Sequence, residues 1–212
     1  MLHNPHHTDD DPEIVRELIR DNPWAIIVSQ KDGDLVASHY PVLLDTVSSE
    51  DGAEELTVVT HVGRPDDKNH ALDGSEVLLI IQGRHGYISP SWYVPGTTPA
   101  PTWNFSVVHA HGVPEILDPD ENLRVLTRLV AHFEQHVEEP MYLDPEWGGP
   151  LSRGTVGLRI PITRFQTQVK MSLDKDPVSR QNVIDHLREP GPYSDPDLAD
   201  DMERARARRG HP

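Results

Sequence analysis

Short runs of β-branched and aliphatic residues, each ended by glycine, proline or aspartate, follow one another along most of this 212-residue chain. Clear examples are 24–29 (WAIIVS), 56–62 (LTVVTHV) and 77–81 (VLLII). Such residues favour strands because their side chains pack well on a pleated sheet. Asp32-Gly33, between two of these runs, is typical of a β-hairpin. The pattern predicts a domain built on short antiparallel strands.

Helices are predicted at three places. The first begins at Pro12, with Asp11 as its N-cap, and ends before Pro23. The other two are predicted over 118–138, which carries a stripe of leucines at helical spacing, and over 179–187. Together with five to seven strands, these helices predict an α+β fold on an antiparallel barrel.

The remaining segments are predicted to be irregular. Residues 1–10 are polar and histidine-rich and are expected to form an arm. Loops are predicted over 48–55, 93–102 and 142–153, which are rich in glycine, proline or acidic residues. From Glu189 the chain is rich in proline, aspartate and arginine, which is typical of poor order. We therefore expect one domain over 1–188 and a flexible charged tail over 189–212.

Composition excludes several classes of function. The chain has no cysteine, which excludes disulfides and thiolate metal sites and, with no signal peptide at the N-terminus, predicts a cytoplasmic location. No apolar run is long enough to span a bilayer. The net charge of −16 argues against direct contact with nucleic acid. The arginine-rich run over 204–209 is expected to be a solvated tail, with DNA contact as the alternative.

Thirteen histidines invite a search for metal ligands. His132 and His136 have the i, i+4 spacing of a helical metal site but lie off the apolar stripe, so surface positions are expected. His109 and His111 alternate on one strand and should share a face, which would line a pocket or the surface. His61 precedes Arg64 by three residues, and an imidazole with a nearby guanidinium suits an anionic planar cofactor, through an iron and a propionate or phosphate.

The segment over 82–112 combines turn residues with an unusual density of aromatic side chains. Its two densest stretches are 87–93 (YISPSWY) and 101–105 (PTWNF). Tryptophan and tyrosine supply flat apolar area with a polar group, which suits a flavin, a porphyrin or a dimer interface. A purely structural cluster is the alternative. Rossmann, P-loop and serine-hydrolase signatures are missing.

At these residues the chain resembles the PaiB-like family of FMN-binding negative transcriptional regulators. The resemblance covers about residues 1–188 and is carried by 38–41 (SHYP), His61 with Arg64, 77–83, 87–93, 101–105, Val108-His109 and 169–172 (VKMS) with Arg180. It implies an antiparallel split β-barrel of the FMN-binding type with flanking helices. It also implies a homodimer with cofactor sites at the subunit interface.

The family that the chain resembles also includes heme-dependent piperazate synthases, which close an N–N bond in an N-hydroxylated ornithine. The resemblance thus implies heme b with His61 as its iron ligand, FMN being the alternative cofactor, and a small-molecule amine as substrate. The other residues expected to bind the cofactor are Arg64, Ser89, Trp92, Trp103, Asn104 and Lys170. The candidates for proton transfer are His109, Tyr93 and Lys68.

The chain departs from the family pattern near the expected site. Members usually read His-x-x-Arg-Ala-Asn-Pro-x-Trp, whereas here Arg64 is followed by 65–70 (PDDKNH), and Lys-Leu-Ser-Gln becomes 170–173 (KMSL). These changes and His61 favour a heme enzyme. A flavin-binding regulator or sensor, or a homodimer without a cofactor, remain the alternatives.

Overall fold

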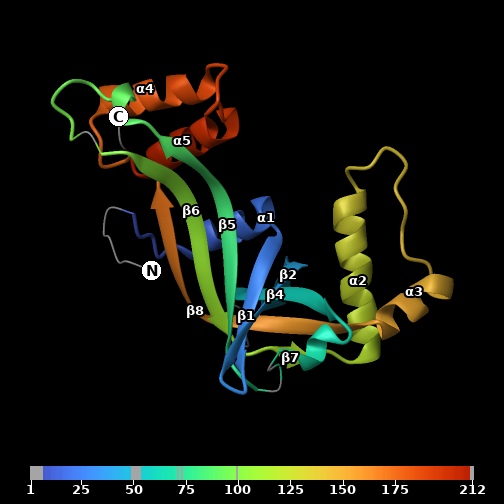
Figure 1. Ribbon diagram of the computed structural model, residues 1–212. Helices are drawn as coiled ribbons and strands as arrows, with labels where there is room; N and C mark the ends of the chain where they lie inside the picture. Colours follow the sequence, from blue (N-terminus) through green and yellow to red (C-terminus); the bar gives the residue numbers. More distant parts are fainter. Residues whose placement is uncertain (1–6, 49–53, 71, 73, 99, 211–212) are drawn as a thin grey trace. The chain divides into compact units, whose positions relative to one another are not determined.

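The structure is a computed structural model that describes residues 7–48, 54–70, 72, 74–98 and 100–210 (Figure 1). Its elements follow in this order: α1 (Pro12–Asp21), β1 (Trp24–Lys31), β2 (Asp34–Pro41), β3 (Leu43–Ser48), β4 (Glu54–Gly63), the 3-10 helix η1 (Asp66–Lys68), β5 (Val77–Ile88), the 3-10 helix η2 (Pro90–Trp92), β6 (Thr102–Gly112), β7 (Glu115–Ile116), α2 (Pro119–Glu134), α3 (Pro145–Arg153), β8 (Thr155–Lys170), α4 (Pro177–Arg188) and α5 (Pro196–Arg208). No helix in the described part of the chain is long and apolar enough to cross a membrane.

The strands of the described residues form one sheet in the order β2-β1-β5-β6-β8-β4-β3, with β7 beside β8. The pairs β1–β2, β1–β5, β3–β4 and β4–β8 are antiparallel. The predicted hairpin is confirmed: β1 and β2 pair from Trp24 opposite Pro41 to Lys31 opposite Asp34. Its two turn residues, Asp32 and Gly33, both have positive φ, as a tight two-residue hairpin requires.

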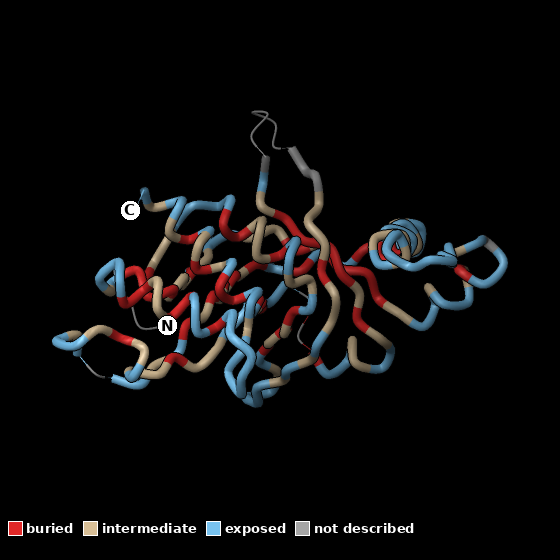
Figure 2. The backbone as a smooth tube through the Cα atoms, turned by 90° about the horizontal axis from the view of Figure 1, so that it is seen from above, coloured by how far each residue is buried: buried red, intermediate tan, exposed pale blue. Residues whose placement is uncertain are grey.

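The chain forms two compact units, each drawn from separate stretches of sequence. The first unit comprises Met1–Asp11, Gln82–Val108 and Gln166–Pro212. The second unit comprises Pro12–Ile81 and His109–Phe165. Within both, the buried stretches of the backbone alternate with exposed turns and helix faces (Figure 2).

The first unit has a core between its strands and the last two helices. Buried apolar side chains of β5, β8, α4 and α5 meet there, among them Ile88, Met171, Val183, Leu198 and Met202. The N-terminal segment closes this unit: the amide of Val169 donates to the carbonyl of His7 at 2.7 Å, and Arg209 donates to the carbonyl of Thr8 at 3.2 Å.

In the second unit α2 packs on the sheet through Val125 and Leu129, which form a core cluster with Val59 and Leu117. Asp118 caps α2 as predicted, accepting hydrogen bonds from the amides of Asp120 and Glu121. The helix ends at Glu134, so His136 lies beyond it and is exposed. His132 and His136 therefore do not form an i, i+4 pair on one helix.

Two segments expected to be irregular are helical. Within the predicted loop 142–153, Asp144 caps α3 by accepting from the amides of Glu146 and Trp147. Within the predicted tail 189–212, α5 buries Leu198 and Met202 completely, so this stretch is not a poorly ordered tail. The segment after α3 is one long strand, β8.

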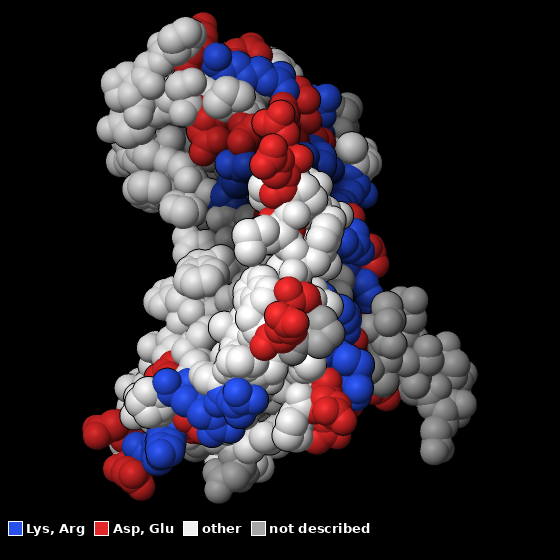
Figure 3. All heavy atoms as spheres, turned by 90° about the vertical axis from the view of Figure 1, so that its right-hand side faces the viewer, with Lys and Arg blue, Asp and Glu red and all other residues white. Residues whose placement is uncertain are grey.

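Several charged residues of α5 are paired within the first unit. Arg188 bonds Asp200 at 2.6 Å and Glu203 at 3.1 Å, and Arg204 pairs with Asp201. Acidic and basic side chains are intermingled on the face that Figure 3 shows. Residues 1–6 of the predicted N-terminal arm and 49–53 of the predicted loop over 48–55 lie outside the described residues.

Candidate functional site

The residues predicted to form the site divide between the two units. Those of the first unit are Ser89, Trp92, Tyr93, Trp103, Asn104 and Lys170. Those of the second unit are His61, Arg64, Lys68 and His109.

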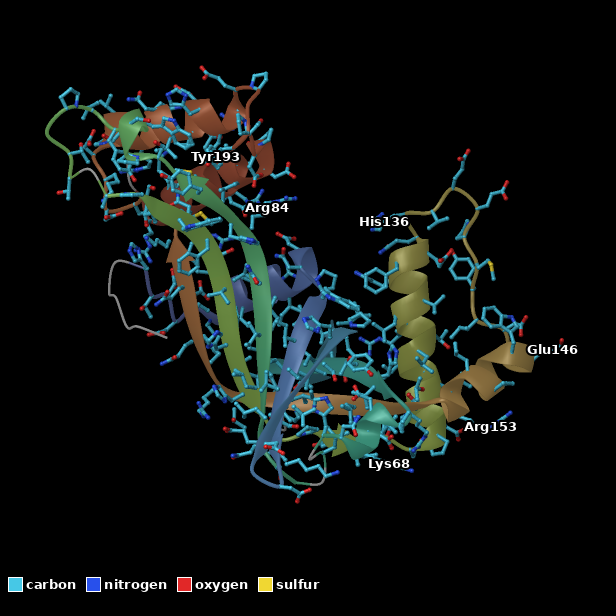
Figure 4. The ribbon with its side chains drawn as sticks, in the orientation of Figure 1. Lys68, Arg84, His136, Glu146, Arg153 and Tyr193 are labelled. Carbon is cyan, nitrogen blue, oxygen red and sulfur yellow. The ribbon has the colours of Figure 1, made fainter. Side chains whose placement is uncertain are left out.

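Trp103 is the centre of an aromatic surface on β5 and β6 in the first unit. Its side chain is half exposed, its ring centroid lies 6.3 Å from that of His85, and the edge of Tyr87 approaches at 6.2 Å. Tyr87 in turn contacts Tyr193, 5.1 Å between ring centroids. Figure 4 labels Tyr193 and Arg84, which both belong to this unit. Alternation along the strands, with Asn104 and Ser106 buried, turns these rings outward.

A shallow pocket of about 300 Å³ adjoins Trp103. It is lined by Gln82, His85, Trp103, Phe105, Ser106 and Val107. The amide of Gln82 and Nδ1 of His85 are 3.0 Å apart, which gives the rim of this apolar pocket hydrogen-bonding groups. Sequence reasoning selected Trp103 but not Gln82 or His85. Gln82 precedes His85 by three residues and His85 precedes Tyr87 by two, so all three lie on one strand, β5.

The other predicted residues of the first unit have partners inside it. Asn104 is buried, accepts a hydrogen bond from Ser172 Oγ at 3.0 Å and donates to Met202 Sδ at 3.3 Å. Lys170 donates to Thr102 Oγ1, and burial lowers the pKa of its ammonium group. Their roles in cofactor binding stay predictions.

The segment around η2 holds three further predicted residues. Ser89 caps η2 by accepting from the amide of Ser91. Trp92 stacks on His186, 5.2 Å between centroids. Tyr93 is buried, its hydroxyl has no hydrogen-bond partner among the described residues, and burial raises the pKa of its phenol.

His61 lies on β4 in the second unit, opposite Gly157 of β8. Its ring meets that of Tyr40 edge-on at 5.8 Å. Its Nδ1 atom is buried without a hydrogen-bond partner among the described residues, and burial lowers the pKa of the imidazole. A neutral ring with an unused nitrogen fits the chemistry of an axial iron ligand.

The residues after His61 turn back over η1. Arg64 Nη1 donates to Asp67 Oδ2 at 2.9 Å, and the carbonyl of Lys68 accepts from Lys31. Lys68, labelled in Figure 4, keeps an exposed side chain. A pocket of about 410 Å³ lies here and is lined by Lys31, Arg64, Asp67, His70, Leu72, Ile116 and Val156.

His70, in the stretch that departs from the family pattern, is the most connected histidine of this unit. Its Nδ1 lies 2.9 Å from Ser29 Oγ and its Nε2 lies 3.0 Å from Ser38 Oγ. Tyr40 donates to Asp66 Oδ2 at 2.9 Å, next to the same imidazole. Sequence reasoning did not select His70, since its partners come from three separate strands and loops.

His109 and His111 share one face of β6, with Val108 and Ala110 buried on the other, as predicted. Burial lowers the pKa of His109. His111 Nδ1 is 3.4 Å from Glu76 Oε2. In the described residues no three histidine, aspartate or glutamate side chains converge on a possible metal site.

Comparison with known proteins identifies the family. Residues 1–164 match the family model described as "Putative FMN-binding domain". A relative from Bacillus subtilis (strain 168), "Protease synthase and sporulation protein PAI 2", is 28% identical over 83% of this chain and 84% of its own. A relative from Emericella nidulans is 27% identical over 84% and 86% of the two chains.

Two solved structures share the fold. The FAD and heme binding protein from Mycobacterium smegmatis superimposes with a TM-score of 0.57 at 14% identity, over 77% of this chain and 73% of that one. The flavocytochrome Anf3 from Azotobacter vinelandii gives a TM-score of 0.57 at 15% identity, over 76% and 68%. The fold is thus the predicted antiparallel split barrel with flanking helices, and the chain belongs to the PaiB-like family of FMN-binding split-barrel proteins.

Proposed function

We propose that this protein binds a flavin of the FMN type, with the isoalloxazine ring against Trp103 in the pocket between β5 and β6. The observation that carries the proposal is the half-exposed Trp103 beside an apolar pocket with a polar rim. A flavin ring is apolar at one end and rich in hydrogen-bonding groups at the other. Phe105 suits the apolar end, and Gln82 and His85 suit the polar end. The family description and the flavin-binding neighbours support it.

FMN titration tests this proposal. Flavin fluorescence should be quenched on binding, because an indole in van der Waals contact with the ring quenches it. Trp103→Ala should weaken binding by about tenfold, the value of one aromatic stacking contact. Trp24→Ala, an exposed tryptophan on β1, is the matched control and should change nothing. No quenching of the wild-type mixture up to millimolar FMN would reject the proposal.

A second candidate is a heme enzyme that forms an N–N bond in an N-hydroxylated diamino acid, as piperazate synthases do. It is favoured by the buried, unused Nδ1 atom of His61. When bound, a heme iron supplies a Lewis acid that weakens an N–O bond. In the reaction the hydroxylamine N–O bond breaks, the N–N bond forms and water leaves, so no external oxidant or reductant is needed.

In this second candidate the chain's own residues position the amine and move protons. Lys68 and His109 belong to the same unit as His61, and Tyr93 belongs to the other. The lowered pKa of His109 leaves its imidazole neutral and able to accept the proton that the attacking amine loses. The absorption spectrum of heme-loaded protein tests the iron ligand. If the Soret band of His61→Ala equals that of wild type, His61 is not the ligand. His136→Ala is the control.

The proposal includes a homodimer. Apolar side chains that lie exposed on and between α2 and α3 support it: Phe133, Val137, Met141, Tyr142, Trp147 and Leu151. So many exposed apolar groups in one stretch are typical of a surface that another protein covers.

A further inference from the structure

Arg180, on α4, is a buried arginine without an anionic partner in the described chain. Only 4% of the residue is exposed. Its Nη2 donates to the carbonyl of Lys175 at 3.2 Å, while Nε and Nη1 have no hydrogen-bond partner among the described residues. A guanidinium stays charged at any ordinary pH, and burying it unpaired costs several kcal/mol. An anion bound against these nitrogens would satisfy their hydrogen-bonding capacity and their charge.

A second unsatisfied donor belongs to the same part of the first unit. The hydroxyl of Tyr93 is also buried without a partner among the described residues. Lys175 connects the two: its carbonyl accepts from Arg180, and its Nζ atom lies 5.8 Å from the ring centroid of Tyr93. The amide of Val94, next to Tyr93, donates to Oγ of Ser179, next to Arg180, at 3.0 Å. This hydrogen bond holds the two chain segments together.

The charges around these donors do not balance. Lys170, Lys175 and Arg180 carry three positive charges, and Asp174 and Lys175 both act on the ammonium group of Lys170. Asp174 bonds Lys175 at 2.8 Å, and Asp176 is used as the N-cap of α4. Both aspartates are negatively charged, so counted against the three cations they leave one positive charge, which an anion would neutralise.

We propose that Arg180, with Tyr93 and the lysines at 170 and 175, forms a binding site for a phosphate group. The Nε and Nη1 atoms, which lie on different edges of the guanidinium, each carry a hydrogen that can bond an oxygen of a phosphate or carboxylate. The remaining positive charge favours an anion, and the oxygens of a phosphate can accept from each of these donors. The site is independent of the ring contact at Trp103, so it goes beyond the proposed flavin function, and its phosphate belongs either to FMN itself or to a separate phosphate-bearing ligand.

Thermal unfolding with inorganic phosphate tests the site. Phosphate should raise the Tm of wild-type protein, at constant ionic strength set with sodium chloride, since a ligand of the folded state stabilises it. Arg180→Met should weaken phosphate binding by about tenfold or more. Without phosphate its Tm should equal or exceed that of wild type, because an unpaired buried charge is replaced by an apolar chain of similar size. Arg84→Met, an exposed arginine paired with Asp197, is the control.

Two results would overturn the proposal: the same phosphate-induced shift in Arg180→Met as in wild type, or a lower Tm of that variant in phosphate-free buffer. If Arg180→Met does not fold, Tyr93→Phe, which removes only the hydroxyl, decides the matter. It should weaken phosphate binding several-fold, and an unchanged affinity would count against the site.

FMN and riboflavin distinguish the two sources of phosphate. If the group is that of FMN, Arg180→Met weakens FMN binding and leaves riboflavin binding unchanged. If the phosphate group belongs to another ligand, Arg180→Met binds inorganic phosphate more weakly, while FMN and riboflavin bind as they do to wild type. A wild-type protein that binds phosphate but neither flavin would reject the proposed function and leave the phosphate site standing.

Discussion

The imidazole of His70 lies with its Nε2 atom 3.8 Å from Oδ2 of Asp66 inside the second unit. Burial lowers the pKa of His70, and the attraction of Asp66, which acts in the opposite sense, does not outweigh it. The folded protein therefore prefers the neutral imidazole, while the unfolded chain titrates at its ordinary pKa of 6.5.

Stability should consequently fall as the solution is acidified. Above the unfolded pKa of 6.5, His70 is neutral in both the folded and the unfolded chain, and its full contribution to stability is present. Below it the unfolded chain binds a proton that the folded chain resists, so stability is lost as the pH drops towards the lowered folded pKa. Urea unfolding at pH 8 and at pH 5.5 measures this loss. His70→Gln should lose less stability than wild type over this interval, and the exposed His136→Gln should lose as much as wild type.

Asp45 is a largely buried carboxylate of the second unit and should be costly to neutralise. Arg128 bonds one of its oxygens at 2.6 Å and Arg159 the other at 3.1 Å. Burial alone would raise the pKa of Asp45, but the hydrogen bonds from the two arginines outweigh it and lower the pKa. We expect Asp45→Asn to reduce the unfolding free energy by about 2 kcal/mol.

The exposed pair of Glu13 and Arg20 provides the comparison for Asp45. Both side chains are about half exposed, so Glu13→Gln should cost less than about 1 kcal/mol. Chemical denaturation of the two variants in parallel measures both values. Equal losses would mean that the two arginines contribute no more to the fold than a solvated ion pair.

The packing of α5 leads to a third prediction. Leu198 is fully buried in the core of the first unit. Leu198→Ala should lower the unfolding free energy by about 3 kcal/mol, through lost apolar burial and the cavity left behind. Ala207→Ser, on the exposed face of the same helix, should change it by less than about 0.5 kcal/mol. A loss no larger in Leu198→Ala than in Ala207→Ser would show that the helix does not dock.

The exposed apolar stretch on α2 and α3 leads to the fourth prediction. If it forms the homodimer contact, Phe133→Glu should shift the molar mass measured by light scattering from that of a dimer to that of a monomer, because a carboxylate would be buried without a partner. Leu35→Glu, an exposed leucine on β2, is the control. A dimer that survives Phe133→Glu and Trp147→Glu together would place the contact elsewhere.

Much of the fold could be predicted from local patterns. The hairpin at Asp32-Gly33 and the start of α2 at Asp118 follow from turn and capping chemistry that acts within a few residues. The helix α3 was not predicted because Gly148, Gly149 and Pro150 are helix breakers, and only the cap at Asp144 indicates a helix. The helix α5 was not predicted because its charged residues outnumber the four small or apolar residues that pack into the core of the first unit.

The candidate site was harder to predict than the fold. Trp103 could be selected because an aromatic residue in an aromatic-rich strand is visible in the sequence itself. Tyr93 was selected only as a candidate for proton transfer and Arg180 only as part of the family resemblance. That their donors are unsatisfied could not be predicted, since it depends on tertiary packing, in which η2 contacts α4. The network of His70 with Ser29 and Ser38 depends likewise on strands that are distant in sequence.

The closure of the first unit by its N-terminal segment has a consequence for synthesis on the ribosome. His7 bonds Val169, and Asp9 bonds Thr167, 158 positions later. The ribosome makes the chain from its N-terminus, so residues 7–9 find these partners only after about 160 further residues have been made. The first unit can therefore complete its structure only after residues 166–208 have been made, whereas the hairpin of β1 and β2 can form early. A chain that stalls before Thr167 leaves the backbone groups of residues 7–9 without these partners.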